Sequence, residues 1–161
     1  MNRSLRGLAI AVVLPLSAFG ITGCGASGVL DRCVPAGGAA VGANELVGTY
    51  RGVHDAAGAR LTLSLGPGQH GGTLTVDDWP TGTYYRAELG KTFKGSGTWV
   101  VDTRSQGHPL VRLSFTQPHD WLPGDTVDRL TVAADSTRTV LYEDSDPDTC
   151  PDFRLDLARA K

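Results

Sequence analysis

The chain has 161 residues, of which 15 are basic and 17 acidic, so its formal net charge at pH 7 is −2. Because residues 1–23 carry Arg3, Arg6 and no acidic residue, the rest has 13 basic and 17 acidic residues and a net charge of −4. This balance argues against nucleic-acid binding and against electrostatic attraction to anionic lipid, and the length suits one domain.

The first segment in chain order is an uncharged hydrophobic run, Gly7–Gly20, that follows the two arginines. It is shorter than the about 20 residues of a membrane-spanning helix, but it suits a secretory signal. The run ends at Ile21-Thr22-Gly23-Cys24, which resembles the lipobox of bacterial lipoproteins. The resemblance implies that residues 1–23 are a cleaved signal peptide. It also implies that Cys24 carries fatty acyl chains such as palmitate, which anchor the protein to the extracytoplasmic face of the cell membrane. The alternative is a secreted protein in which Cys24 has no such role.

Residues 24–43 come next, and Gly25–Ala43 is dominated by Gly, Ala and Val without a periodic apolar face. Such a segment buries too little surface to offset the entropy of ordering, so we expect a flexible tether that only Cys33 fixes. With Cys24 used for lipid, Cys33 and Cys150 remain as a pair in an oxidising compartment, which predicts a disulfide between them. Two free thiols or a pair of metal ligands are the alternative.

From residue 44 to residue 161 we expect a single β-domain. Leu61, Leu63 and Leu65 alternate with polar residues, which is the period of a half-buried strand. The expected strands are 46–53, 61–65, 73–76, 84–93, 97–102, 111–115, 127–133, 137–142 and 153–157, with intervening turns that include 66–72, 94–96 and 134–136. Trp99 lies within a strand and is expected in the core.

About eight such strands without a convincing helix between them predict an all-β antiparallel meander that closes into a small barrel. A two-sheet β-sandwich is the alternative. In a closed meander the first and last strands are neighbours. The Cys33–Cys150 disulfide is therefore expected to join the segment before the first strand to the segment before the last.

Short motifs spread along the domain carry a resemblance. It rests on 46–50, 78–80, 95–99, 141–142 and 146–150. These stretches are similar to a group of uncharacterised actinobacterial lipoproteins, which implies a shared exported fold and no particular activity. The Gly-Thr-Tyr and Gly-Thr-Trp stretches also resemble calycin-type barrels such as lipocalins and avidins. That second resemblance implies a barrel with a small apolar ligand inside.

Side chains for catalysis or metal binding are sparse. Four histidines lie in expected loops: His54, His70, His108 and His119. The sequence has no H-E-x-x-H, no G-x-S-x-G and no phosphate-binding Gly-Lys loop. The acidic segment 143–148 begins with the spacing of a calcium loop, but Pro147 and Leu155 occupy positions that such a loop needs for other residues. We therefore expect no enzyme, metal or cofactor, and a solvated turn before Cys150.

Two loops place a tryptophan between aspartate and proline, and they give the predicted ligand-binding residues Trp79, Tyr84 and Trp121. The alternative is that these tryptophans fold over a barrel end as core plugs. The function we predict is a monomeric, non-enzymatic lipoprotein of the cell envelope that binds a small ligand or an envelope protein at one barrel end. A purely structural surface domain, or a hydrolase with a dispersed site such as His119 with Asp120 or Asp78, are the alternatives.

Overall fold

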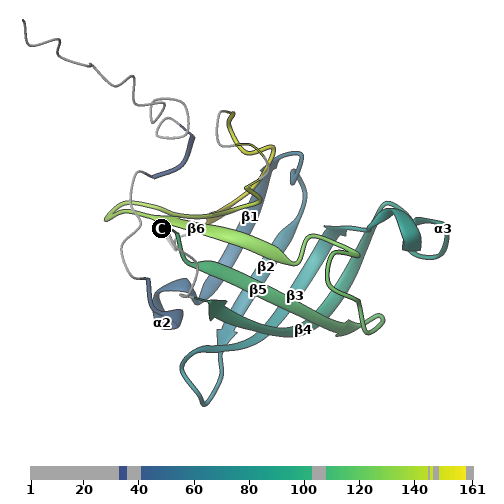
Figure 1. Ribbon diagram of the computed structural model, residues 1–161, viewed down its shortest axis with the longest axis horizontal. Helices are drawn as coiled ribbons and strands as arrows, with labels where there is room; N and C mark the ends of the chain where they lie inside the picture. Colours follow the sequence, from purple (N-terminus) through teal and green to yellow (C-terminus); the bar gives the residue numbers. More distant parts are fainter. Residues whose placement is uncertain (1–32, 36–40, 103–107, 145, 147–148, 159–161) are drawn as a thin grey trace, which may run out of the picture.

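The computed structural model describes residues 33–35, 41–102, 108–144, 146 and 149–158. Its strands are β1 Gly48–His54, β2 Arg60–Leu65, β3 Gly71–Pro80, β4 Thr92–Asp102, β5 Leu110–Gln117, β6 Arg129–Ala134, β7 Thr139–Tyr142 and β8 Phe153–Leu157. Each strand pairs antiparallel with the next, and β8 pairs with β1, so the eight strands form a closed barrel (Figure 1). The predicted all-β meander barrel is confirmed, and the chain does not form the two-sheet sandwich. The predicted signal peptide 1–23, Cys24 and residues 25–32 and 36–40 of the predicted tether lie outside the described residues.

Alternating side chains fill the inside of the barrel. On β2, Leu61 and Leu63 point inward, while Thr62 points outward and its hydroxyl lies 3.1 Å from that of Thr49. The inward side chains are Tyr50, Leu61, Leu63, Leu74, Val76, Trp79, Phe93, Trp99, Val111, Leu113, Phe115, Leu130, Val132, Leu141, Phe153 and Leu155, all between 0 and 7% exposed. Trp99 is in the core as predicted. With almost no accessible surface left on these residues, side chains rather than a ligand-sized space occupy the barrel.

The segment 84–93, predicted as a strand, is wrong over most of its length. Thr83–Tyr85 forms the 3₁₀ turn η2 and Arg86–Leu89 forms the short helix α3. The residues of α3 are good helix formers, and Gly90 ends the helix with φ of 82° while its N–H donates to the Arg86 carbonyl at 3.1 Å. Only the last residues of the segment continue into β4.

The predicted turn at 94–96 is also wrong, because β4 runs through it. The register between β4 and β5 shifts between Ser96 and Gly97, which marks a β-bulge. At Gly95 an added Cβ would lie 2.5 Å from the Gln117 carbonyl oxygen and 2.7 Å from the Phe93 ring. The glycines therefore allow close approach of neighbouring strands in a bulged strand, rather than a reversal of the chain.

Part of the predicted tether packs against the barrel. Val41 and Ala43 join the core beside Leu46 of the helix α2 (Ala43–Leu46), where β1 begins. The Tyr50 hydroxyl donates to the Leu46 carbonyl at 2.8 Å and so holds α2 over this end of the barrel. Val34 is buried as well. The prediction that Cys33 alone fixes residues 24–43 is therefore wrong at these positions, because each valine buries apolar surface against a strand.

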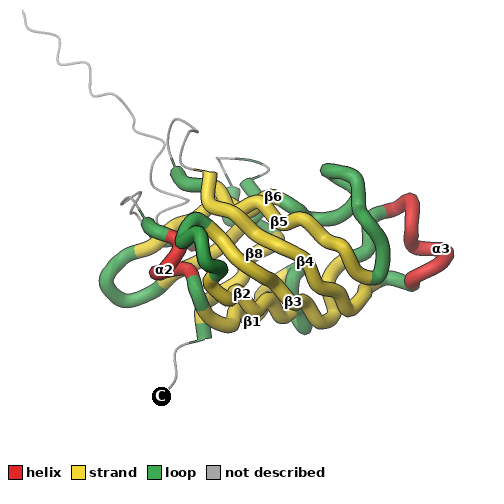
Figure 2. Tube along the Cα trace, turned by 90° about the horizontal axis from the view of Figure 1, so that it is seen from below, coloured by secondary structure: helices red, strands yellow, loops and turns green. Residues whose placement is uncertain are grey.

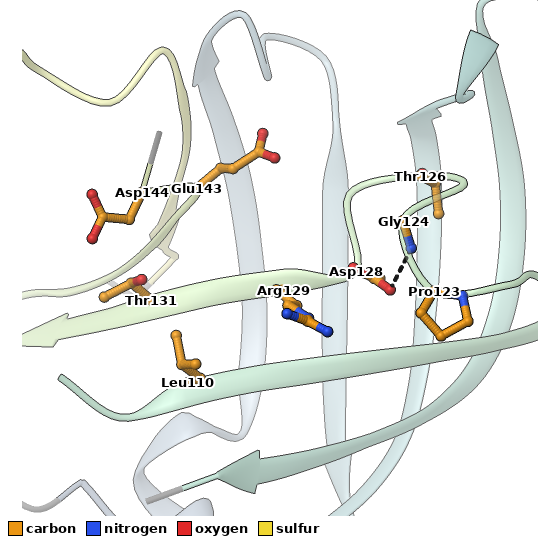
Figure 3. Close-up of a pocket in the computed structure, with 9 residues that line it drawn as sticks. All are labelled: Leu110, Pro123, Gly124, Thr126, Asp128, Arg129, Thr131, Glu143 and Asp144. Carbon is orange, nitrogen blue, oxygen red and sulfur yellow. Dashed lines mark hydrogen bonds between the residues drawn. The ribbon is translucent and has the colours of Figure 1, made fainter. Parts of the chain in front are cut away.

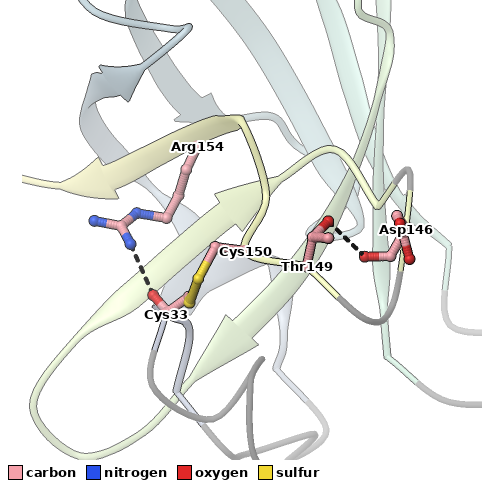
Figure 4. The surroundings of a disulfide bond; sticks show 5 residues. All are labelled: Cys33, Asp146, Thr149, Cys150 and Arg154. Atoms are coloured by element: carbon pink, nitrogen blue, oxygen red, sulfur yellow. Dashed lines mark hydrogen bonds between the residues drawn. A yellow bond between two sulfur atoms is a disulfide. The ribbon is translucent and has the colours of Figure 1, made fainter.

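The predicted disulfide between Cys33 and Cys150 is present, with the two Cα atoms 5.7 Å apart and a sequence separation of 117 (Figure 4). It joins the segment before β1 to the segment before β8, as expected for neighbouring strands. The Cys33 carbonyl accepts a hydrogen bond of 2.8 Å from Arg154 Nη1 on β8. Cys33 and Val34 pack on the outward side chains of β6 and β7, which are Ala133, Val140 and Tyr142. The disulfide thus holds a short stretch of chain against the outer wall.

The antiparallel order places successive connections at opposite ends of the barrel. Figure 2 shows α2 at one end and α3 at the other. We call the second the α3 end. It carries the connections 55–59, 81–91 and 118–128 and the described residues of 143–152. Because Trp79, Tyr84 and Trp121 lie in or beside two of these connections, the fold brings the three predicted binding residues to one end.

The turn between β6 and β7 depends on one carboxylate. Asp135 Oδ1 accepts hydrogen bonds from Thr137 N and Thr137 Oγ1, each at 2.6 Å, and from Arg138 N at 2.8 Å. The hydrogen bond from the Thr137 hydroxyl, followed by those from the two backbone N–H groups, lowers the pKa of Asp135 to about 2. Such bonds favour the ionised carboxylate in the folded state.

We expect Asp135→Ala to lower the melting temperature at pH 7, because three donors lose their acceptor. The folded pKa lies below the unfolded one. The stabilisation is therefore present above pH about 4 and is lost as pH falls through about 2. Thermal unfolding at pH 7, 4 and 2 measures this, with Asp152→Asn as a control at another exposed aspartate. A constant difference between Asp135→Ala and wild type over this range would contradict the assignment.

Candidate functional site: the aromatic α3 end

The innermost part of the α3 end is Trp79, near the end of β3. Its side chain is 0% exposed, and its indole N–H donates to the Val127 carbonyl at 3.1 Å. The ring meets Phe153 edge-on at a centroid distance of 5.3 Å and Phe115 at 6.2 Å. Trp79 therefore closes the barrel interior as a plug, and this position leaves none of its surface for a ligand.

A second layer of rings lies above this plug. Phe93 meets Phe115 edge-on at 5.4 Å and stacks on Trp121 at 4.6 Å with an interplanar angle of 23°. Trp121 also meets Tyr85 edge-on at 4.7 Å. These rings come from β4, β5, η2 and the connection 118–128, so the layer joins segments that are far apart in the sequence.

The outermost layer reaches solvent. Tyr84 is 83% exposed and rests against Tyr85 at a centroid distance of 5.0 Å, while Leu122 is 70% exposed beside Trp121 in sequence. Both are large apolar side chains, and the burial of such groups on binding is favourable. The α3 end thus presents two exposed apolar side chains on a support of packed rings.

His119 ties the connection 118–128 to α3. Its ring stacks on Tyr85 at 5.6 Å, and its Nε2 lies 3.0 Å from Glu88 Oε1. The hydrolase alternative pairs His119 with Asp120 or Asp78, whereas the partners that the structure gives this ring are Glu88 and Tyr85. We assign it the role of positioning the loop that carries Trp121 and Leu122.

The remainder of this loop is held by polar contacts. Leu122 N donates to Asp125 Oδ2 at 3.1 Å, and Gly124 N donates to Asp128 Oδ2 at 3.0 Å. The Thr126 hydroxyl donates to the Pro80 carbonyl at 2.6 Å, next to a β-bridge between Thr81 and Thr126. The exposed Leu122 therefore stands on an ordered turn, which reduces the entropy lost when a partner covers it.

Two buried polar atoms at the α3 end have no hydrogen-bond partner within the described part of the chain: the indole nitrogen of Trp121 and the hydroxyl oxygen of Thr81. A buried N–H donor without an acceptor costs free energy. Among the predicted binding residues, Trp121 thus has unused hydrogen-bonding capacity, Tyr84 has free surface, and Trp79 has neither.

The other sequence candidates do not join this cluster. His54 is the last residue of β1 rather than a loop residue, and its φ is 53°. His70 lies at the opposite end, just before β3. Among the described residues, no three His, Cys, Asp or Glu side chains are grouped closely enough to hold a metal ion. Sequence reasoning also missed Phe93 and Phe115 as part of this site, because only strand register brings these two rings together.

Comparison of the chain with protein-family models, with curated proteins and with solved structures found no match. No helix in the described ranges has the length and hydrophobicity needed to cross a bilayer.

Proposed function

We propose that this protein is a non-enzymatic, lipid-anchored domain of the cell envelope that binds another envelope protein through its α3 end. The lipid anchor is supported by the lipobox motif at Cys24 and by the disulfide, which is typical of exported proteins. The observation that carries the binding function is the exposure of Tyr84 and Leu122, at 83% and 70%, above a packed aromatic layer.

A protein partner fits this surface better than a small ligand inside the barrel. The inward side chains fill the barrel, so an interior ligand would have to displace Trp79 and its neighbours. Exposed tyrosine and half-buried tryptophan are the residue types that dominate binding energy in protein interfaces. Their rigid support means that little conformational entropy is lost when the partner docks.

A purely structural surface domain is the second candidate, and the filled interior favours it over a ligand carrier. The two candidates differ at the α3 end. A structural domain needs no contact through Tyr84 or Leu122, whereas a binding domain loses its partner when both are made polar.

The test compares wild type with the double variant Tyr84→Ser and Leu122→Ser in membranes from cells that make the protein. Native electrophoresis of detergent-solubilised membranes should show wild type in a larger complex and the double variant as free protein. Thr75→Ala with Thr98→Ala, on the exposed outer wall, is the matched control and should keep the complex. Cys24→Ser should release the protein from the membrane. Free migration of wild type would favour the structural candidate, and membrane retention of Cys24→Ser would remove the lipid anchor from the proposal.

A further inference from the structure

Next to the turn that carries Trp121 and Leu122, the barrel has an open pocket of about 610 Å³ (Figure 3). It lies where the pairing of β5 with β6 ends, since these strands pair only over Leu110–Arg112 and Arg129–Thr131. The turn that contains Pro123 and the residues that follow β7 form its other walls. The volume is in the range of about 300 to 1,000 Å³ that is typical of small-molecule sites.

The pocket carries charges of both signs that the protein does not pair. Figure 3 shows Arg129 between Asp128 on one side and Glu143 and Asp144 on the other. Asp128 accepts a hydrogen bond from Gly124 N, but the side chains of Arg129, Glu143 and Asp144 form no ion pair within the described residues. One guanidinium and two carboxylates are thus available to a ligand.

The electrostatics of Glu143 support this view. Burial raises the pKa of Glu143 above its ordinary value, and the negative charge of Asp128 raises it further. Both effects act against the negative charge of Glu143, and a bound positive charge would act in the opposite direction. The carboxylates around the pocket are not grouped as a metal site, at least within the described residues, which suits an organic ligand with separated charges.

Uncharged residues line the pocket between the charged groups. Leu110 and Pro123 give apolar contact for an aliphatic chain, and Thr131, which is 6% exposed, lines the pocket from β6. A ligand that matches these walls therefore carries a positive group and a negative group joined by a short apolar chain.

We propose that this pocket binds a basic amino acid or the corresponding unit of a short peptide, with an ammonium group at Glu143 and the carboxylate at Arg129. The guanidinium of arginine holds a carboxylate through two parallel hydrogen bonds, which gives the pocket its selectivity for a carboxylate-bearing ligand. The pocket shares the connection 118–128 with the aromatic layer, but Tyr84, Trp121 and Leu122 do not line it, so different variants test the two proposals.

Isothermal titration of the full-length protein in detergent with L-lysine tests the proposal, with 1,5-diaminopentane as the matched ligand that lacks the carboxylate. We expect lysine to bind about tenfold more tightly than the diamine. Arg129→Gln should abolish that difference, and Glu143→Gln should weaken both ligands about fivefold. Arg51→Gln and Asp152→Asn, exposed charges outside this pocket, should change neither affinity.

A second readout separates binding at this site from binding elsewhere. Nuclear magnetic resonance of the Glu143 carboxyl carbon should show its pKa falling when lysine is added. Circular dichroism of each variant checks that it is folded, and Arg129→Lys, which keeps the charge, should retain part of the selectivity. The proposal is overturned if lysine gives no heat at millimolar concentration. It is also overturned if lysine leaves the Glu143 titration unchanged or binds the folded pocket variants as tightly as wild type.

Discussion

Replacing Cys33 and Cys150 together by serine is expected to lower the free energy of unfolding by about 4 to 5 kcal/mol, the largest effect we predict for this protein. The disulfide closes a loop with a sequence separation of 117, and such a long loop greatly restricts the unfolded chain. It also holds Val34 against Ala133 and Val140, so this packing should weaken as well.

Denaturant unfolding of the oxidised, reduced and double-serine proteins measures this effect. The reduced protein and the serine variant should unfold at the same, lower midpoint. Amide exchange at Ala133 and Val140, which Cys33 and Val34 cover, should speed up more than exchange at Leu63 on the other side of the barrel. Equal midpoints for oxidised and reduced protein would show that the bridge contributes nothing to stability.

Trp79→Ala is expected to cost about 3 to 5 kcal/mol of stability, the range for removal of a large aromatic side chain from a core. The substitution leaves a cavity beside Phe115 and Phe153, and it leaves the Val127 carbonyl without its donor. Trp79→Phe keeps part of the ring packing and loses the hydrogen bond, so it should cost clearly less.

The same substitution at Tyr84 distinguishes a buried aromatic residue that fills the barrel from an exposed one on its surface. Tyr84→Ala removes a ring of similar chemistry that is 83% exposed, so its unfolding midpoint should stay close to that of wild type. Urea unfolding of the three variants measures the differences. A loss below about 1 kcal/mol for Trp79→Ala would mean that Trp79 does not fill the barrel.

Alternation of apolar and polar residues was enough to predict most of the barrel. Leu61 and Leu63 on β2, and Val111, Leu113 and Phe115 on β5, have the period of two that a strand with one buried face requires. The pairing of Cys33 with Cys150 followed from the two cysteines that remain in an oxidising compartment when Cys24 carries lipid. The closed meander predicted the location of the bridge, because it makes the first and last strands neighbours. Regular local pattern and topology together determine these features.

The secondary-structure predictions were wrong where the same residue types are common in two kinds of structure. Gly95 and Gly97 are typical of turns, but here they serve a bulged strand whose neighbours approach closely. The aromatic residues Tyr84 and Tyr85 are common in strands, yet the good helix formers that follow them and Gly90 favour a short helix. Tertiary context thus decides the structure at Gly95 and Gly97, whereas local helix propensity decides it at Arg86–Leu89.

The candidate site could be predicted only in part. The prediction placed Trp79 and Trp121 in loops, but Trp79 lies within β3. The different burial of the two rings depends on where β3 ends and on which rings lie beneath it. Phe93 and Phe115 enter the cluster through strand register, and the mixed-charge pocket forms from β5, β6 and two connections that are distant in sequence. No local motif marks such a surface.

Site-specific photo-crosslinking in living cells tests most directly whether the α3 end is the binding surface. A photoreactive residue in place of Tyr84 should yield a crosslink to one envelope protein, and the same residue in place of Thr75, exposed on the outer wall, should yield none. Leu122→Ser should reduce the yield at position 84 strongly. Equal yields at positions 84 and 75, or no product at position 84 from folded, membrane-bound protein, would contradict the account.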